Sequence, residues 1–389
     1  MDLELLAELR TREEVLASAA ELAGGDPLSA ATALRSRGIE PALAAAALTQ
    51  ASLRRAARAK FGPAADRMFF TRAGLEQATR AVVAERRAAR LAAAGVRTLA
   101  DLGCGLGSDA LAAARAGIHV YAVDADPLTA GIARANAEAL GLGDHVEVHC
   151  ADATSVPVER YDAVFADPAR RRAGRGRVFD PASFSPPWDF VAGLASRVPR
   201  TVLKLAPGID HALLPAGAEG EWVSVGGDLV EAAFWCGPLA EVPRRATLLG
   251  AAPAELTGPS DVPAPVGPLG RYLYDPDPAV VRSHLVAAFA ERVGGRLADQ
   301  EIAYVYADQP AETPFARRLE ITDVLPFSLK RLRALLRERG VGRLEIRKRG
   351  SALEPEALRR DLKLAGPAAA GLVLTRVANA PTVLITAPL

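Results

Sequence analysis

The segment Asp101-Leu-Gly-Cys-Gly-Leu-Gly107 joins a short apolar stretch to an Ala-rich one. Residues 96–102 have the pattern of a buried β-strand, and residues 109–116 that of a helix. Glycines between a strand and a helix let the backbone turn tightly and approach a ligand that a Cβ would exclude. The segment therefore predicts a strand, a ligand-binding turn and a helix, although such turns also occur as plain loops.

Strands and helices continue to alternate beyond this segment. Further strands are predicted at residues 118–123, 145–149, 161–166 and 201–205, and a helix at 127–140. This order predicts an α/β fold whose parallel sheet is covered by helices on both faces. Residues 221–225 and 229–235 follow as two strands with no strong helix between them, which predicts an antiparallel hairpin at one edge of the sheet.

Changes of composition divide the 389 residues into four parts. A helical segment covers residues 1–65, and the α/β sheet domain covers residues 66–250. A Pro-rich linker is expected at 251–268. The remainder, 269–389, has helix and strand patterns and predicts a second, smaller α/β domain.

The composition favours a folded protein of the cytoplasm. Hydrophobic residues make up 50% of the chain and charged residues 24%. Cys104, Cys150 and Cys236 are too few and too scattered for a disulfide framework or a zinc site, so no metal is expected. The N-terminus lacks the pattern of a secretory signal, and the longest stretches without a charged residue, 41–53 and 377–389, are shorter than the roughly 20 residues of a spanning helix.

Aspartates follow the predicted strands at positions where a ligand is expected. Asp124 ends the second strand, Asp152 follows the third, and Asp167 follows the fourth. A dinucleotide site requires Gly-x-Gly-x-x-Gly, and Ser108 stands where its last glycine belongs. The acidic Asp101 before the glycines is unfavourable beside a pyrophosphate but suits a cationic ligand.

This layout resembles the class I S-adenosylmethionine-dependent methyltransferases, whose first motif is an acidic residue followed by spaced glycines. The resemblance implies a Rossmann-like sheet with S-adenosylmethionine as the methyl donor. The residues expected to bind the donor are Asp101, Gly103, Gly105, Gly107, Asp124 (the ribose hydroxyls) and Asp152 (the adenine). Asp109 is interpreted mainly as a first-turn carboxylate favoured by the helix dipole.

Further motifs are similar to those of bacterial class I methyltransferases with a THUMP-like C-terminal domain. The resemblance covers residues 66–389. Its motifs are Phe69-Phe-Thr-Arg-Ala-Gly-Leu-Glu-Gln77, Thr313-Pro-Phe-Ala-Arg317, Leu325-Pro-Phe-Ser-Leu-Lys330 and Glu345-Ile-Arg-Lys-Arg-Gly350. It implies that Thr71, Glu76 and Gln77 lie beside the donor pocket; the alternative is an ordinary helix start capped by Thr71.

The segment after the fourth strand is expected to carry the chemistry. In this superfamily Asp/Asn-Pro-Pro-aromatic often marks methylation of an exocyclic amine, and here the motif reads Asp167-Pro-Ala-Arg170. Asp167, Pro168 and Arg170 are therefore the candidate catalytic residues. A C5-pyrimidine mechanism requires a cysteine, which residues 203–208 lack.

Two nearby residues have open interpretations. Trp188 is either a stacking platform for the substrate or a residue that packs against its own loop. Lys204 either meets a phosphate or extends its stem at the strand end.

The net charge of +1 conceals a strongly uneven distribution. Residues 50–90, 170–177 and 317–363 together carry +19, so the rest of the chain carries −18. Such segments are typical of surfaces that follow a phosphate backbone, although Arg-rich helices can also be plain solvated faces. Residues expected to contact substrate are Arg171, Arg172, Trp188, Lys204, Lys330, Arg347 and Lys348.

Together these observations predict a methyltransferase that modifies a base nitrogen of RNA, either tRNA or rRNA. Two alternatives remain at this point. The acceptor is a small molecule or a protein, or the chain binds donor and RNA with little catalysis.

Overall fold

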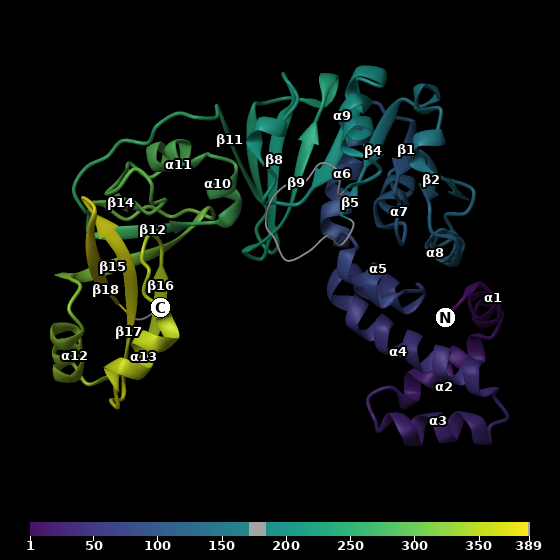
Figure 1. Ribbon diagram of the computed structural model, residues 1–389, viewed down its shortest axis with the longest axis horizontal. Coiled ribbons are helices and arrows are strands. Elements are labelled where there is room, and N and C mark those ends of the chain that lie inside the picture. The colour runs from purple at the N-terminus through teal and green to yellow at the C-terminus, as the bar shows by residue number, and fades with distance from the viewer. Residues whose placement is uncertain (171–183, 388–389) are drawn as a thin grey trace. The chain divides into compact units, whose positions relative to one another are not determined.

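The computed structural model describes residues 1–170 and 184–387, and the chain forms two compact units. One unit comprises Met1–Ala218 and Ala233–Glu241, and the other comprises Glu219–Ala232 and Val242–Leu389. Both are mixed α/β structures, which confirms the predicted fold class (Figure 1). No helix in the described ranges has the length and apolar character needed to cross a bilayer.

The first unit begins with four helices that share the core of the sheet. They are α1 (Leu3–Thr11), α2 (Glu13–Leu22), α3 (Pro27–Ser36) and α4 (Pro41–Phe61). Asp2 caps α1 through the amide of Leu5, and Asp26 caps α3 through the amide of Ser29. Leu9 and Leu43 belong to the same buried cluster as Leu99 of the sheet, so these helices are packed onto the α/β core.

Helix α1 packs closely against α8 (Pro127–Ala139) at a glycine. A Cβ on Gly131 of α8 would lie 2.6 Å from Cδ2 of Leu3, so only glycine leaves room for that side chain. The chain then passes through a short 3₁₀ turn (Gly62–Asp66) and two helices, α5 (Arg72–Gln77) and α6 (Ala81–Ala93), before the first strand.

Parallel strands follow in the predicted alternation. They are β1 (Thr98–Leu102), β2 (His119–Asp124), β3 (Val146–Cys150), β4 (Ala163–Ala166) and β7 (Thr201–Leu205), with the predicted helices α7 (Ser108–Arg115) and α8 between them. A further helix, α9 (Trp188–Arg197), lies between β4 and β7 and was not predicted. Leu102 lies level with Val123 on one side and with Ala166 on the other. The loops after β1, β2 and β4 therefore leave the sheet at one edge, which brings their polar residues together.

Beyond β7 the sheet continues further than predicted. Gly226 and Gly227, with φ of +61° and +87°, form the turn between β8 (Glu219–Val225) and β9 (Asp228–Trp235), as in a type I′ hairpin. Two more strands, β10 (Arg244–Leu249) and β11 (Ala254–Gly258), follow, and the sheet has the order β11-β10-β8-β9-β7-β4-β1-β2-β3. The predicted hairpin is therefore present but two strands from the edge.

Strands β10 and β11 were not predicted, because they contain charged residues that are unusual in buried strands. Glu219 is fully buried and accepts a hydrogen bond from Nε of Arg245 at 2.8 Å, and Arg245 also pairs with Glu255. Burial of such charges is tolerated because they are paired. Strand β11 lies within the stretch predicted as a Pro-rich linker, and the linker itself remains a prediction.

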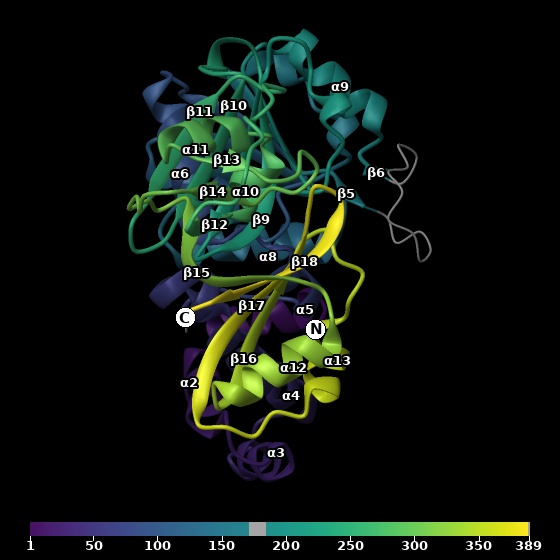
Figure 2. The same ribbon diagram turned by 90° about the vertical axis from the view of Figure 1, so that its left-hand side faces the viewer.

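The C-terminal part builds a second sheet, with the order β13-β14-β12-β15-β18-β17-β16. Its elements are β12 (Tyr272–Pro276), α10 (Pro278–Arg282), α11 (Val286–Arg292), β13 (Arg296–Leu297), β14 (Val305–Ala307), β15 (Ala316–Pro326), α12 (Leu329–Glu338), β16 (Val341–Lys348), α13 (Pro355–Leu362), β17 (Ala368–Val377) and β18 (Ala380–Thr386). Helices α12 and α13 lie beside each other and contact β16 (Figure 2). Their leucines close a small apolar core.

Candidate functional site

The glycine turn after β1 adopts a conformation that requires its glycines. Gly103, Gly105 and Gly107 have φ of +91°, +57° and +86°. The amides of Gly103 and Cys104 both donate to the carbonyl of Val123 at 2.9 Å, which fastens the turn to the end of β2. A Cβ on Gly103 would lie 3.4 Å from the backbone oxygen of Asp167, so the turn passes close to the segment after β4.

Asp101 is a buried carboxylate with no partner of its own. Its exposed fraction is 0%, and neither carboxylate oxygen has a hydrogen-bond partner among the described residues. Burial raises the pKa of Asp101 well above its usual value, and the nearby charges of Asp109 and Asp167 raise it further. Arg87 acts in the opposite direction. The site is therefore electronegative and is suited to a cationic ligand.

Asp124 is held in place by backbone amides. Its Oδ2 accepts from the amide of Gly105 at 3.1 Å, and its Oδ1 accepts from the amide of Asp126 at 2.9 Å. Burial raises the pKa of Asp124, and these two bonds reduce that effect. Each oxygen keeps a further lone pair, so the fixed carboxylate can still accept from the hydroxyls of a ligand.

Asp152 lies after β3 at the same edge of the sheet, but it is exposed. Its Oδ1 accepts from the amide of Thr154 at 2.8 Å and from its hydroxyl at 2.7 Å. This side chain caps a short 3₁₀ turn, Ala153–Ser155. The loop that could contact an adenine is therefore held in shape by Asp152 itself.

The upstream motif lies directly on the glycine turn. Thr71 caps α5 by accepting from the amide of Gly74 at 3.0 Å, as the helix-start interpretation predicts. A Cβ on Gly74 would lie 2.7 Å from Cδ2 of Leu106, so α5 packs against the turn. Glu76 and Gln77 are exposed at the end of this helix.

Asn136 joins the same two segments and was not predicted. It is fully buried on α8; its Oδ1 accepts from the amide of Phe69 at 2.7 Å, and its Nδ2 donates to the carbonyl of Leu106 at 3.0 Å. The signal in the sequence is an amide side chain on the apolar face of the Ala-rich helix 127–140. Asn136 therefore fixes the glycine turn to the segment before α5.

Replacement of Asn136 with alanine is expected to lower stability and ligand affinity together. The change leaves the amide of Phe69 and the carbonyl of Leu106 buried without partners, at a cost of about 1–3 kcal/mol in the free energy of unfolding. Denaturant titration and calorimetric titration with S-adenosylmethionine measure the two effects. Thr49→Ala, at an exposed position of α4, is the control; equal behaviour of the two variants would contradict the role of Asn136.

A buried ion pair lies behind the glycine turn. Asp109, in the first turn of α7, accepts from the hydroxyl of Thr79 at 2.7 Å and pairs with Arg87, whose side chain is only 4% exposed. The guanidinium of Arg87 also lies 4.7 Å from the ring centre of Phe165 on β4. Asp109 thus has a specific partner as well as the first-turn position predicted for it.

The loop after β4 carries Asp167, which forms an ion pair with Lys204 at the end of β7. Lys204 is 12% exposed and Asp167 is 34% exposed, so the carboxylate remains reachable while the ammonium is largely covered. Neither predicted interpretation of Lys204 included this partner. Pro168, next to Asp167, is buried.

The backbone of this loop forms a short antiparallel pair, β5 (Ala169–Arg170) with β6 (Phe184–Ser185). Arg170 lies opposite Phe184 in this pair. Trp188 starts α9, half-buried, with its ring 5.6 Å from that of Phe184, which agrees with packing against its own loop. Arg171 and Arg172 lie outside the described residues.

The remaining predicted residues belong to the second compact unit. Lys330 is exposed on α12. Arg347 donates to Asp275 at 2.6 Å and to Glu345 at 2.8 Å, and Lys348 donates to Glu354 at 2.6 Å. The structure thus brings Asp101, the glycine turn, Asp124 and Asp167 to one edge of the sheet. It shows Arg347 and Lys348 in ion pairs.

Comparison with known proteins assigns the family. A methyltransferase-domain family matches residues 99–171, a THUMP domain-like family matches residues 316–388, and a domain of unknown function matches residues 2–57. An uncharacterized S-adenosylmethionine-dependent methyltransferase of Mycobacterium tuberculosis is 36% identical over 342 residues, which are 84% of this chain and 90% of the relative. The chain belongs to the S-adenosylmethionine-dependent methyltransferases. The predicted enzyme class and methyl donor are thereby confirmed.

A solved structure shows the same fold for the methyltransferase as a whole. The crystal structure of a protein of Porphyromonas gingivalis W83 classed as a methyltransferase superposes with a TM-score of 0.75 at 24% identity. The match covers 96% of this chain and 98% of that one, so it includes the N-terminal helices and the C-terminal sheet.

The residues present fit S-adenosylmethionine on structural grounds. The glycine turn offers backbone without Cβ atoms, and Asp101 offers a carboxylate that has no hydrogen-bond partner in the part of the chain that the structure describes. A sulfonium with an amino-acid end supplies the positive charge that such a site favours.

Proposed function

We propose that this methyltransferase transfers the methyl group of S-adenosylmethionine to a base nitrogen of RNA, tRNA or rRNA, and that Asp167 orients the acceptor amine. The observation that carries the proposal is the place of Asp167. It follows β4, lies next to Gly103, and keeps its carboxylate reachable beside Lys204.

The donor end of the site is assigned by charge and by hydrogen bonding. Asp101 attracts the cationic amino-acid end, the glycine turn accommodates its backbone, and Asp124 accepts from the ribose hydroxyls. The donor's sulfonium makes its methyl carbon electrophilic. Because Asp101, Asp109 and Asp124 interact electrostatically, the site favours the charged donor over the neutral thioether product.

The acceptor end requires alignment more than a nucleophilic side chain. Lys204 holds one oxygen of Asp167, and the carboxylate can accept an N–H hydrogen bond from the acceptor amine. The amine nitrogen then attacks the methyl carbon in line, the C–S bond breaks as the N–C bond forms, and the nitrogen releases one proton. Alignment and exclusion of water contribute most of the rate in such a transfer.

Exposed basic residues support RNA as the acceptor. In the described part of the second unit, Lys330, Arg331, Arg343 and Arg360 are exposed, and their side chains have no hydrogen-bond or ion-pair partner there. The side chain of Arg72, the first residue of α5, is also exposed and has no partner among residues 1–170 and 184–387; α5 packs against the glycine turn. Unpaired guanidinium and ammonium groups are the ones available to phosphates. The THUMP domain-like match over residues 316–388 agrees with this assignment.

Binding of RNA should therefore depend steeply on salt. We expect the affinity for total bacterial RNA to fall at least about tenfold between about 50 and 200 mM salt. Lys330→Ala combined with Arg331→Ala should weaken binding and reduce the salt slope. Arg37→Ala with Arg160→Ala, two exposed arginines outside the basic segments, serves as the control.

The decisive experiment follows the label from the donor. The protein is incubated with methyl-labelled S-adenosylmethionine and a cell extract, and the RNA, protein and metabolite fractions are separated. Label in an N-methylated nucleoside supports the proposal. Label in protein or metabolites alone contradicts it and favours the other acceptors, and donor binding without labelled product favours a binding protein with little catalysis.

A further inference from the structure

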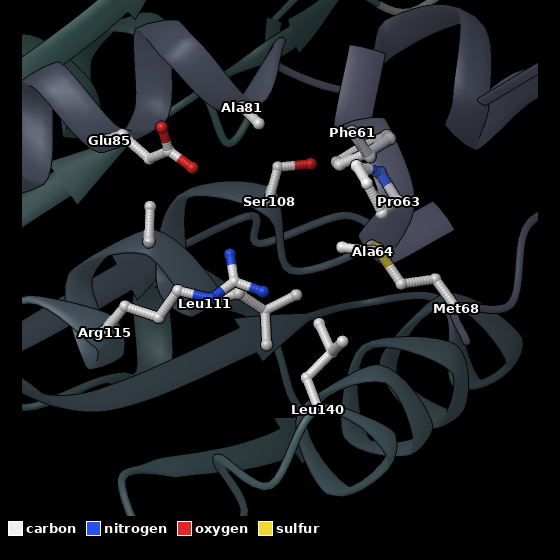
Figure 3. A pocket seen from close by; sticks show the side chains of 11 residues that line it. Phe61, Pro63, Ala64, Met68, Ala81, Glu85, Ser108, Leu111, Arg115 and Leu140 are labelled. Atoms are coloured by element: carbon white, nitrogen blue, oxygen red, sulfur yellow. The ribbon is translucent and has the colours of Figure 1, made fainter. Parts of the chain in front are cut away.

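The first unit has a pocket lined by residues other than those proposed to hold the donor. It has a volume of about 180 Å³ and is formed by α4, the 3₁₀ turn after it, α6, α7 and the end of α8 (Figure 3). Its apolar wall includes Phe61, Met68, Leu111 and Leu140. None of the residues proposed to hold the donor or the acceptor lines it.

Three polar groups interrupt this apolar wall. Ser108, the first residue of α7, is 9% exposed, and its buried hydroxyl has no hydrogen-bond partner within the described residues. Glu85 on α6 and Arg115 on α7 are exposed, and the described parts of the chain show no ion pair or hydrogen bond for either. Figure 3 shows them on one side of the pocket, with Arg115 reaching toward its middle and Glu85 above it.

We propose that this pocket binds a small zwitterion with an unbranched apolar tail, that is, a free α-amino acid. Arg115 can hold the carboxylate through two parallel N–H bonds, and Glu85 can hold the ammonium group. The tail then covers Leu111 and its apolar neighbours. The volume is below the roughly 300–1,000 Å³ of drug-sized sites, which restricts the ligand to a small metabolite.

The opposite charges of Glu85 and Arg115 favour a zwitterion over a ligand that carries only an acid or only an amine. An acid alone would leave Glu85 without a partner and beside a second negative charge, and an amine alone would leave Arg115 beside a like charge. A zwitterion satisfies both. The proposal goes beyond methyl transfer, because it concerns a second site. Ligand binding at this site can be measured without donor or acceptor.

L-norleucine is the probe, and titration of the full-length protein by calorimetry and NMR measures its binding. We expect a Kd of about 1 mM or tighter. Hexanoate, which lacks the ammonium group, pentylamine, which lacks the carboxylate, and glycine, which lacks the tail, should each bind at least about tenfold more weakly. No shift with norleucine, or hexanoate and pentylamine binding as well as norleucine, would overturn the proposal.

Substitutions at two exposed positions test which residue binds the ammonium group of the ligand and which binds its carboxylate. Glu85→Gln should weaken norleucine about tenfold and tighten hexanoate, because it removes the like charge beside the carboxylate. Arg115→Gln should weaken norleucine about tenfold and tighten pentylamine for the same reason. Glu21→Gln and Arg37→Gln, exposed changes on α2 and after α3, are matched controls and should bind like the parent. Titration of the same samples with S-adenosylmethionine reports folding of the donor site. Norleucine affinity that is unchanged in both pocket variants rejects the site, whatever the outcome for methyl transfer.

Discussion

Replacement of Asp101 with asparagine is expected to stabilise the ligand-free protein and to weaken donor binding at least about 100-fold. In the ligand-free protein Asp101 is fully buried, its carboxylate has no partner among the described residues, and burial raises its pKa, so its ionised form opposes folding. A neutral amide of the same shape removes that charge, and the unfolding free energy should rise by about 1–3 kcal/mol. The same amide cannot attract the cationic end of the donor. Thermal unfolding and calorimetric titration measure the two effects.

The pH dependence of the unfolding free energy tests whether the buried carboxyl group of Asp101 causes this difference in stability. Because the pKa of Asp101 is raised in the folded state, the folded protein binds more protons than the unfolded one between the usual carboxyl pKa and the raised value. The parent should therefore lose stability relative to Asp101→Asn as the pH rises through that window, and the two should converge below it. Asp144→Asn, at an exposed position, should show neither effect. A less stable Asp101→Asn variant, or one that binds donor normally, would contradict this assignment.

The central part of the fold could be predicted because its signals are local. A buried strand, glycines with positive φ and an Ala-rich helix are each encoded within a few residues, and the structure places β1, the turn and α7 within one or two residues of the expected bounds. The parallel order then brings Asp124 and Asp167 to the same edge without further information.

Partners from distant segments could not be predicted in this way. Asn136 is tied to Phe69, and Arg87 to Asp109, by contacts that depend on how helices pack. Strands β10 and β11 carry charges such as that of Arg245 that look solvated in sequence and are paired in the structure. Periodicity describes one element at a time, and these contacts lie between elements.

The net charge of a segment also overstated the number of cationic side chains that are available to bind a phosphate. Within residues 50–90, Lys60 donates to three backbone carbonyls at the end of α5, Arg58 pairs with Asp66, and Arg87 is buried. A sum counts these cations as available to phosphates, although their hydrogen-bonding capacity is used inside the protein. The exposed, unpaired residues of α12 and α5 are therefore the better candidates for contact with an RNA.

Replacement of Asp167 with alanine is expected to reduce methyl transfer by about 100–1,000-fold while donor affinity changes little. The carboxylate is reachable, and its proposed partner is the acceptor amine, so its loss removes alignment of the reacting nitrogen. Asp167→Asn keeps a carbonyl oxygen that accepts an N–H bond and should retain at least about ten times more activity than the alanine variant. Transfer of label to RNA and donor titration on the same samples separate the two steps.

Lys204 provides the matched comparison, because it acts on the acceptor only through Asp167. Lys204→Met removes the cation that fixes one carboxylate oxygen and should lower the rate at saturating RNA about tenfold, and Lys204→Arg should restore most of it, since a guanidinium can also hold a carboxylate. A direct phosphate contact would instead weaken RNA binding in Lys204→Met and leave the rate at saturation intact. If Asp167→Ala transfers methyl groups at the parental rate, the acceptor is oriented by other residues, and Lys204 then serves only to hold the ends of β4 and β7 together.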